Sequence, residues 1–184
     1  MNNGERNARF ERLMLPHLDA AYNLARWLTG NDADAEDAVQ EAYLRALRFF
    51  DGFRGDGAKP WLLAIVRNAC FSLGEQRRIA ALSDPFDETV HSGAEPGDGA
   101  SRIALDPEQA AIGRAERERI GRAIETLPVA FREVLVLREL EDLSYGDIAR
   151  VVDVPLGTVM SRLARARQML RAALVEPVRK LRLR

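Results

Sequence analysis

Residue types that mark secreted or catalytic proteins are scarce in this chain of 184 residues. Its one cysteine, Cys70, cannot form an internal disulfide framework, which favours a reducing cytosol. We expect Cys70 to be a small buried side chain without a redox role. The two histidines stand far apart and no recognisable nucleophile accompanies them. The sequence therefore offers no catalytic residue, metal site or cofactor site, and we expect no enzyme activity.

Long apolar segments are also missing from the chain. No uncharged run approaches the roughly 18 residues that a membrane span needs. The N-terminus lacks the basic, apolar and small-residue pattern of a signal peptide. We therefore expect a soluble, cytoplasmic protein that is not inserted in a membrane.

Strand-like alternation is absent, whereas helical periodicity runs through most of the sequence. Apolar faces predict helices over about 13–28, 34–50 and 61–78, the first ending at Thr29-Gly30. Four further helices are predicted over about 109–126, 129–140, 144–151 and 156–174, with Pro128 as first residue of the second of these and Pro155 opening the last. The fold class is therefore all-α.

Charge and composition divide the chain, although its 27 basic and 28 acidic residues nearly cancel. Residues 79–112 carry one positive and seven negative side chains and are rich in glycine and proline, which predicts a flexible acidic linker. From Ser161 onward eight basic side chains face one acid, so this end suits a polyanion. We expect two small helical domains at 8–78 and 110–175, a linker at 79–109 and a basic tail at 176–184.

The last two predicted helices have the plan of a helix-turn-helix motif. Ser144 followed by Asp147 is a capping-box variant, and the helix that it opens has barely two turns. On the next helix Val159, Leu163, Ala166 and Leu170 form an apolar face, and a separate polar face carries Thr158, Ser161, Arg162 and Arg165. No acid lies between Asp153 and Glu176, so this polar face, which we call the C-terminal polar face, favours DNA reading over mere solvation.

The stretch NDADAEDAVQEAYLRAL gathers acids around the start of one helix. A calcium loop beginning at Asp32 would place Asp37 where glycine is required and Tyr43 where the bidentate glutamate should be, so calcium is excluded. Protein docking beside Gln40 and a solvated acidic face both remain open.

The loop FRGDGAKPW interleaves aromatic and basic residues. Phe53 and Trp61 stand near Arg54, Lys59 and Arg67, a combination that suits unpaired nucleic acid because bases stack on rings and cations hold phosphates. Trp61 can also be a core residue, and for Phe71 we expect the core.

Three stretches together resemble the extracytoplasmic-function (ECF) sigma factors of the sigma-70 family. They are DAEDAVQEAYLRAL, FRGDGAKPWLLAIVRNAC and the long run LPVAFREVLVLRELEDLSYGDIARVVDVPLGTVMSRLARARQMLR. They cover both predicted domains in this order, which makes the resemblance specific. It implies a promoter-specificity subunit that directs core RNA polymerase, recognises −35 and −10 elements, supports DNA melting and is controlled by an anti-sigma factor.

The resemblance also implies roles for individual residues. The clamp helices of polymerase would be bound by Asp34, Glu36, Asp37, Gln40 and Glu41, and the flap would meet helix 129–140. The −10 element would be recognised and held open by Phe53, Arg54, Asp56, Lys59, Trp61, Arg67 and Asn68. The −35 element would be read by Thr158, Ser161, Arg162, Arg165 and Arg167.

Two features depart from the family pattern. Met160 stands where relatives often have Lys or Arg, which puts one backbone or base contact in doubt. The linker is long and very acidic, so it could mimic RNA in a basic channel or simply keep the tether disordered. The runner-up function is a helix-turn-helix regulator that binds duplex DNA without melting it, and the loop at 53–61 argues against it because a duplex-only regulator has no use for such a loop.

Overall fold

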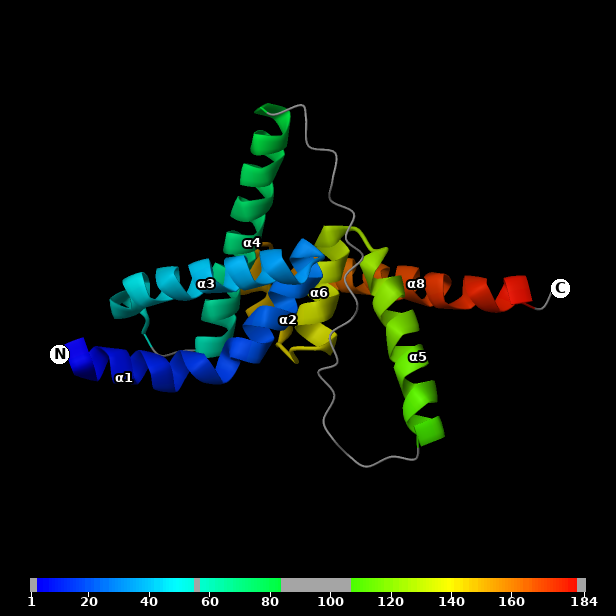
Figure 1. Ribbon diagram of the computed structural model, residues 1–184, viewed down its shortest axis with the longest axis horizontal. Helices are drawn as coiled ribbons and strands as arrows, with labels where there is room; N and C mark the ends of the chain where they lie inside the picture. Colours follow the sequence, from blue (N-terminus) through cyan, green and yellow to red (C-terminus); the bar gives the residue numbers. More distant parts are fainter. Residues whose placement is uncertain (1–2, 55–56, 84–106, 182–184) are drawn as a thin grey trace.

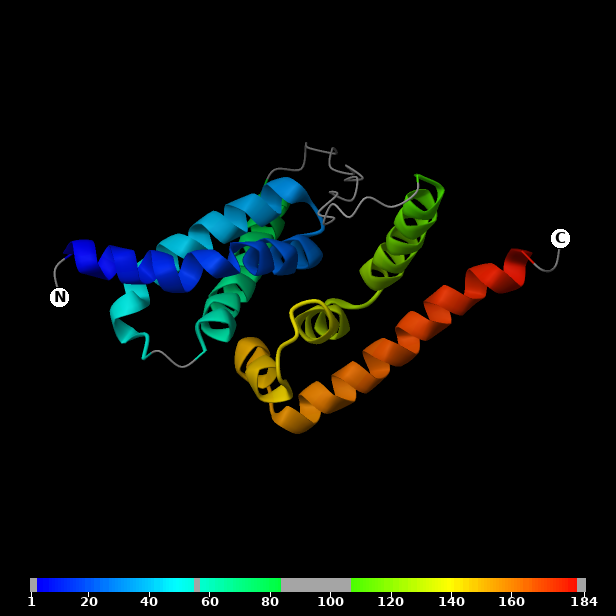
Figure 2. The ribbon, with the colours of Figure 1, turned by 90° about the horizontal axis from the view of Figure 1, so that it is seen from below.

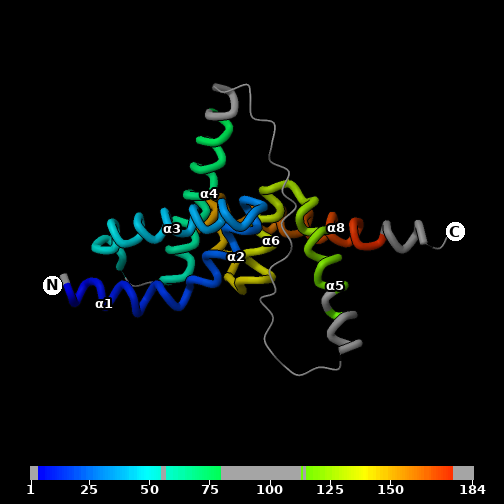
Figure 3. Tube along the Cα trace, viewed as in Figure 1, coloured from blue at the N-terminus to red at the C-terminus, as the bar shows by residue number. Residues whose placement is uncertain are grey.

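The computed structural model describes residues 3–54, 57–83 and 107–181, and every element in these ranges is helical (Figures 1 and 3). This confirms the all-α prediction. The elements are α1 (Asn3–Met14), the 3-10 turn η1 (Leu15–His17), α2 (Leu18–Thr29), α3 (Asp32–Phe49), the 3-10 turn η2 (Phe50–Gly52), α4 (Ala58–Ser83), α5 (Pro107–Glu125), α6 (Val129–Glu139), α7 (Tyr145–Val152) and α8 (Leu156–Leu181). No described helix is both long enough and apolar enough to cross a membrane.

Helices α2, α3 and α4 form the core of the N-terminal half, residues 3–83, and they pack on one another through small side chains. Five alanines have no exposed surface: Ala21, Ala25, Ala35, Ala42 and Ala46. Because alanine lets helix axes approach closely, this core is tight, and the larger Leu24, Leu62 and Val66 fill the remaining space.

The ends of α2 and α3 follow the local chemistry of the sequence. Gly30 has φ +83 and its N–H donates to the Arg26 carbonyl, so the predicted stop at Thr29-Gly30 is confirmed. The side chain of Asn31 accepts from the Asp34 N–H, and this cap starts α3 at Asp32 rather than near Asp34. The first predicted helix is divided, because Pro16 lies in η1 between α1 and α2.

The C-terminal half, residues 107–181, contains the predicted helix-turn-helix. Ser144 Oγ accepts from the Asp147 N–H and starts α7, while Asp153 ends it in the left-handed region with φ 53. The hydrogen bond from the Ser144 hydroxyl lowers the pKa of Asp147. Pro128 and Pro155 each stand one residue before a helix instead of inside it, and their carbonyls accept the first N–H bonds of α6 and α8.

Two helices run further into the predicted linker and tail than periodicity indicated. Helix α4 continues to Ser83, and Figure 1 shows its last turns projecting from the body. Helix α8 continues to Leu181, past the end near residue 174 that periodicity predicted. The expected linker at 79–109 is helical at both ends, and its part from 84 to 106 lies outside the described residues.

The two halves share one hydrophobic core, which the sequence did not predict. Helix α7 packs on α4 and helix α6 packs on α2 (Figure 2). Buried residues of both halves join in one cluster that includes Leu24, Leu63, Leu127, Leu137 and Ile148. Arg132 of α6 extends this contact by donating to the Trp27 carbonyl at the end of α2, 2.9 Å away.

The alanine core predicts a strong penalty for added volume. Replacing Ala42, which is fully buried, with leucine should lower the free energy of unfolding by about 1–3 kcal/mol, because overpacking forces side chains off their rotamers. Urea denaturation measures this loss. The same change at exposed Ala33, on the same helix, should stay within about 0.5 kcal/mol of the wild type. Equal stability of Ala42→Leu and Ala33→Leu would show that the helices are not closely packed.

Burial also predicts an unreactive thiol. Cys70 is 6% exposed, and desolvation raises its pKa to about 12, so little thiolate exists near pH 8. Alkylation of the native protein by iodoacetamide at pH 8 should be at least about 100-fold slower than alkylation in urea. Labelling at similar rates in both conditions would contradict the burial of this side chain.

Candidate nucleic-acid interface and polymerase-binding surface

The C-terminal polar face lies on the first turns of α8, opposite a fully buried stripe. Val159, Leu163 and Ala166 are at most 1% exposed and fix the rotation of the helix. Ser161 and Arg165 are exposed, and within the described part of the chain the Arg165 side chain makes no hydrogen bond or ion pair. This end of α8 therefore presents a cation and a hydroxyl outward, as a major-groove helix requires.

Two arginines of α8 are held by acids of α6. The Arg162 guanidinium donates to Glu133 Oε1 at 3.3 Å. Arg167 makes two bonds to Glu139 Oε1 at 3.0 and 2.7 Å, and this contact raises the pKa of Arg167. Met160 lies on the flank of the C-terminal polar face, where its side chain is 52% exposed and uncharged. Among the three arginines predicted to read the −35 element, Arg165 is thus the one most available to DNA.

The acidic face of α3 has a partner that the sequence did not suggest. Arg77 of α4 forms an ion pair with Asp34 and lies 3.9 Å from Asp37. Glu41 pairs with Arg45 one turn along at 2.6 Å. The Asp37 carboxylate is still 62% exposed, and Glu36 and Gln40 are exposed as well. A protein partner would therefore meet Glu36, Asp37 and Gln40 before the other predicted residues.

Two aromatic residues lie where the sequence did not predict them. Phe53 was expected to offer its ring to bases but is buried, and Phe71 was expected in the core but is exposed. Phe53 is only 6% exposed, stacked on Phe50 and 4.9 Å from the Trp61 ring, so it supports the loop from the core instead of offering its ring to bases. Trp61 is half-buried. Phe71, expected in the core, is 42% exposed because it lies off the buried stripe of α4, with Arg67 over its ring at 4.7 Å.

The loop before α4 depends on Gly57. This residue has φ +75, and a Cβ there would lie 2.9 Å from Pro60 Cγ, so only glycine fits. Arg54 and Asn68 are exposed, as a nucleic-acid contact requires, and Asp56 lies outside the described residues. Burial and, to a smaller extent, the nearby Lys59 charge lower the pKa of His17.

Lys59 and Arg67, the other two cations predicted for the −10 element, are occupied. Lys59 Nζ lies 2.9 Å from Glu141 Oε2 and donates to the Glu141 carbonyl at 2.8 Å. Arg67 donates to both oxygens of Glu133, at 2.7 and 3.3 Å. Both acids belong to the C-terminal half, so each cation bridges the two halves.

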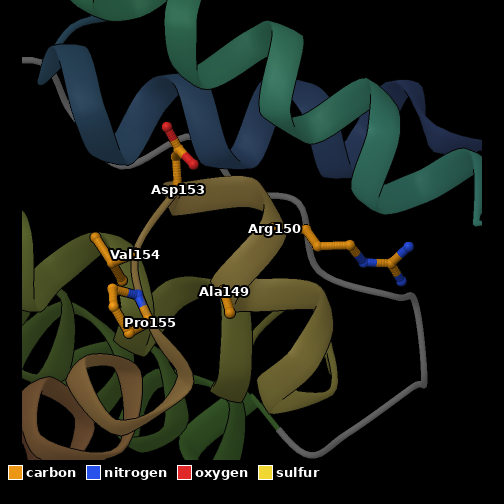
Figure 4. A pocket seen from close by; sticks show the side chains of 5 residues that line it. All are labelled: Ala149, Arg150, Asp153, Val154 and Pro155. Carbon is orange, nitrogen blue, oxygen red and sulfur yellow. The ribbon is translucent and has the colours of Figure 1, made fainter.

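A shallow hollow at the end of α7 is lined by Ala149, Arg150, Asp153, Val154 and Pro155 (Figure 4). In this view the charged ends of Arg150 and Asp153 point away from each other. Arg150 is paired with Asp147 and lies against the Gly57 loop of the other half. The lining contains no nucleophile beside a base, and no cluster of metal-ligating side chains occurs among the described residues.

Comparison with known proteins places these features in a family. Residues 13–78 match the family model of sigma-70 region 2, and residues 117–170 match that of sigma-70 region 4. The ECF RNA polymerase sigma-E factor of Escherichia coli (strain K12) is 41% identical over 137 residues, which are 73% of this chain and 71% of that protein. The chain belongs to the ECF sigma factors.

Other similarities agree with this membership. The ECF RNA polymerase sigma factor SigE of Mycolicibacterium smegmatis is 33% identical over 165 residues, 88% of this sigma factor and 60% of SigE. The structure of RpoE in complex with the anti-sigma factor NepR from Bartonella quintana has TM-score 0.72 and 27% identity, covering 90% of this chain and 96% of RpoE. CnrH, solved with the cytosolic domain of CnrY, shares the fold, with TM-score 0.63, 24% identity, and coverage of 92% and 90%.

Sequence reasoning missed three charged residues of this sigma factor, the cation Arg77 and the acids Glu133 and Glu141. Arg77 stands at the end of a predicted helix and gave no signal. Glu133 and Glu141, the two charged residues that are buried in the described chain, lie beside the most apolar run of the second domain, VLVLREL. A buried acid requires a cation, so their position was a usable signal for partners elsewhere in the chain.

Proposed function

We propose that this sigma factor binds core RNA polymerase and directs it to promoters by reading −35 and −10 elements and supporting DNA melting, with no catalytic activity of its own. It acts in the cytoplasm, as expected for its family. The observation that carries the proposal is the pairing of an exposed helix-turn-helix face, including Ser161 and Arg165, with an exposed acidic surface on α3 in one chain.

The magnitude of DNA melting supports a large partner. Opening ten base pairs costs on the order of 14 kcal/mol at about 1.4 kcal/mol per stacked step. One or two captured bases return only about 1–3 kcal/mol each. The remaining free energy is too large for the −10 residues to supply alone; these are Arg54, Asp56, Lys59, Trp61, Arg67 and Asn68. Phe53 supports the loop from beneath. Core polymerase is therefore required.

The assignment of surfaces follows from exposure and charge. In this proposal Glu36, Asp37 and Gln40 bind the clamp helices, with Asp34 and Glu41 beside them, and α6 meets the flap. Thr158, Ser161, Arg162 and Arg165 read the −35 element, with Arg167 at the flank. An anti-sigma factor controls the protein, as suggested by the likeness to RpoE in complex with NepR. Run-off transcription with core polymerase on fragmented genomic DNA tests the proposal, and absence of specific transcripts would refute it.

Arg165→Ala should weaken binding of the reconstituted holoenzyme to duplex −35 DNA by about 1–3 kcal/mol, because a base or phosphate contact is lost. Fluorescence anisotropy with a promoter fragment identified by run-off transcription measures this change. Arg122→Ala, a charge-matched control on α5 where the side chain is 69% exposed, should bind as the wild type does. Equal affinity of Arg165→Ala and Arg122→Ala would remove Arg165 from the interface.

Asp37→Arg should weaken binding to core polymerase at least about tenfold, since it reverses one charge of an exposed acidic surface. Competition with a labelled wild-type sigma factor measures the affinity. Glu11→Arg on α1, also exposed, is the control with the same charge change. If Asp37→Arg competes as well as Glu11→Arg, α3 is not the docking surface.

A further inference from the structure

The buried charge of the described chain is concentrated where the halves meet. Glu133 and Glu141 are 2% and 6% exposed, and they are its buried charged residues. Each forms an ion pair with a cation of α4, Glu133 with Arg67 and Glu141 with Lys59. Asn23 of α2 adds a longer contact to Glu141, 3.5 Å. The contacts are therefore side-chain bridges between the halves and not pairs within one helix.

The two bridges match in spacing. Lys59 and Arg67 are eight residues apart, and Glu133 and Glu141 are eight residues apart in the opposite direction (67−59 and 141−133). Lys59 and Arg67 both lie on α4, where this separation is about 12 Å along the helix axis, whereas Glu133 lies in α6 and Glu141 lies two residues beyond its end. Each acid thus meets one of two cations on the same helix. Two ion pairs and the hydrogen bond from Lys59 to the Glu141 carbonyl join α4 to these acids, while α6 itself packs on α2.

Glu133 has a second partner in its own half. Its Oε1 accepts from both Arg67 and Arg162, each at 3.3 Å. One carboxylate therefore neutralises an arginine assigned to the −10 element and an arginine assigned to the −35 element. The Arg67 and Arg162 side chains are only 19% and 25% exposed as a result.

We propose that Glu133 and Glu141 act as an internal mimic of DNA phosphates. In the closed form of the free protein, in which the two halves are in contact, these two acids compete with single-stranded DNA for Lys59 and Arg67. This inference rests on the proposed function, in which these two cations hold the −10 strand. Closure also covers the side of α6, the helix assigned to the flap, that packs on α2. Core polymerase thus gains both surfaces only by separating the halves.

The energetics make the mimic effective yet reversible. Each acid is satisfied only while its cation is near, because a buried unpaired charge is strongly disfavoured. When the halves separate, the acids reach water and Arg162 remains for Glu133. The apparent affinity of the free protein for a single strand is the intrinsic affinity multiplied by the fraction of open molecules. When only a small fraction of the molecules is open, the free protein binds promoter DNA weakly, although all of its DNA-binding residues are present.

Removing the acids tests the mimic. Glu133→Gln/Glu141→Gln should open the halves, raise the radius of gyration in small-angle X-ray scattering, and bind a fluorescent random-sequence single-stranded DNA pool at least about tenfold more tightly. Glu118→Gln/Asp142→Asn is charge-matched at exposed sites of the same half, and Asn tolerates the φ of 51 at position 142. It should match the wild type in both measurements. Glu141→Gln alone keeps the Glu133–Arg162 contact and should give an intermediate gain if the double variant folds poorly.

Each outcome decides the inference. Opening together with tighter single-strand binding supports it. Unchanged radius and unchanged binding in both variants overturn it, and so does opening without any gain in binding. Run-off transcription by the wild type with core polymerase separates this failure from failure of the proposed function: transcripts without a gain in the variants refute only the mimic.

Discussion

A buried carboxylate must have cationic partners, and the position of Glu133 organises the whole molecule around this requirement. Its side chain is 2% exposed and takes arginines from two helices, Arg67 of α4 and Arg162 of α8. Helix α6 can therefore lie only where both arginines reach it. That position agrees with the packing of α6 on α2 and of α7 on α4, so the ion cluster and the shared hydrophobic core together hold the two halves against each other.

The same contacts connect the structure to the function of a sigma factor. Lys59 and Arg67, assigned to the −10 strand, and the side of α6 that packs on α2 lie in the contact between the halves, while Arg54, the acidic surface of α3 and Arg165 of α8 remain exposed. In the proposed function, the free protein thus offers polymerase and duplex DNA their first contacts and withholds Lys59 and Arg67, which are needed after melting. This order suits a subunit that has no use for promoter DNA before it meets polymerase.

Local features could be predicted from the sequence because local chemistry determines them. The helix end at Gly30, the cap at Ser144 and the polar face with Thr158 and Ser161 all appear where periodicity and capping rules place them. The exchange between buried Phe53 and exposed Phe71 was not predictable, because periodicity identifies an apolar stripe but not which aromatic at its border is covered.

Contacts between the halves lie beyond sequence reasoning for a different reason. The pairs of Arg67 with Glu133 and Lys59 with Glu141 join positions 66 and 82 residues apart. Nothing in one sequence indicates which distant cation meets which acid. The sequence does show that two acids, Glu133 and Glu141, stand beside an apolar run. The structure shows which cations pair with them.

The central claim is that the halves are closed in the free protein and open on polymerase. Spin labels on exposed Gln76 of α4 and Gln168 of α8, introduced as Gln76→Cys and Gln168→Cys with Cys70 left buried, measure the separation directly by pulsed electron resonance. The account predicts one narrow distance distribution in the free protein and a longer one after core polymerase is added. A broad distribution in the free protein, or no change with polymerase, would contradict it.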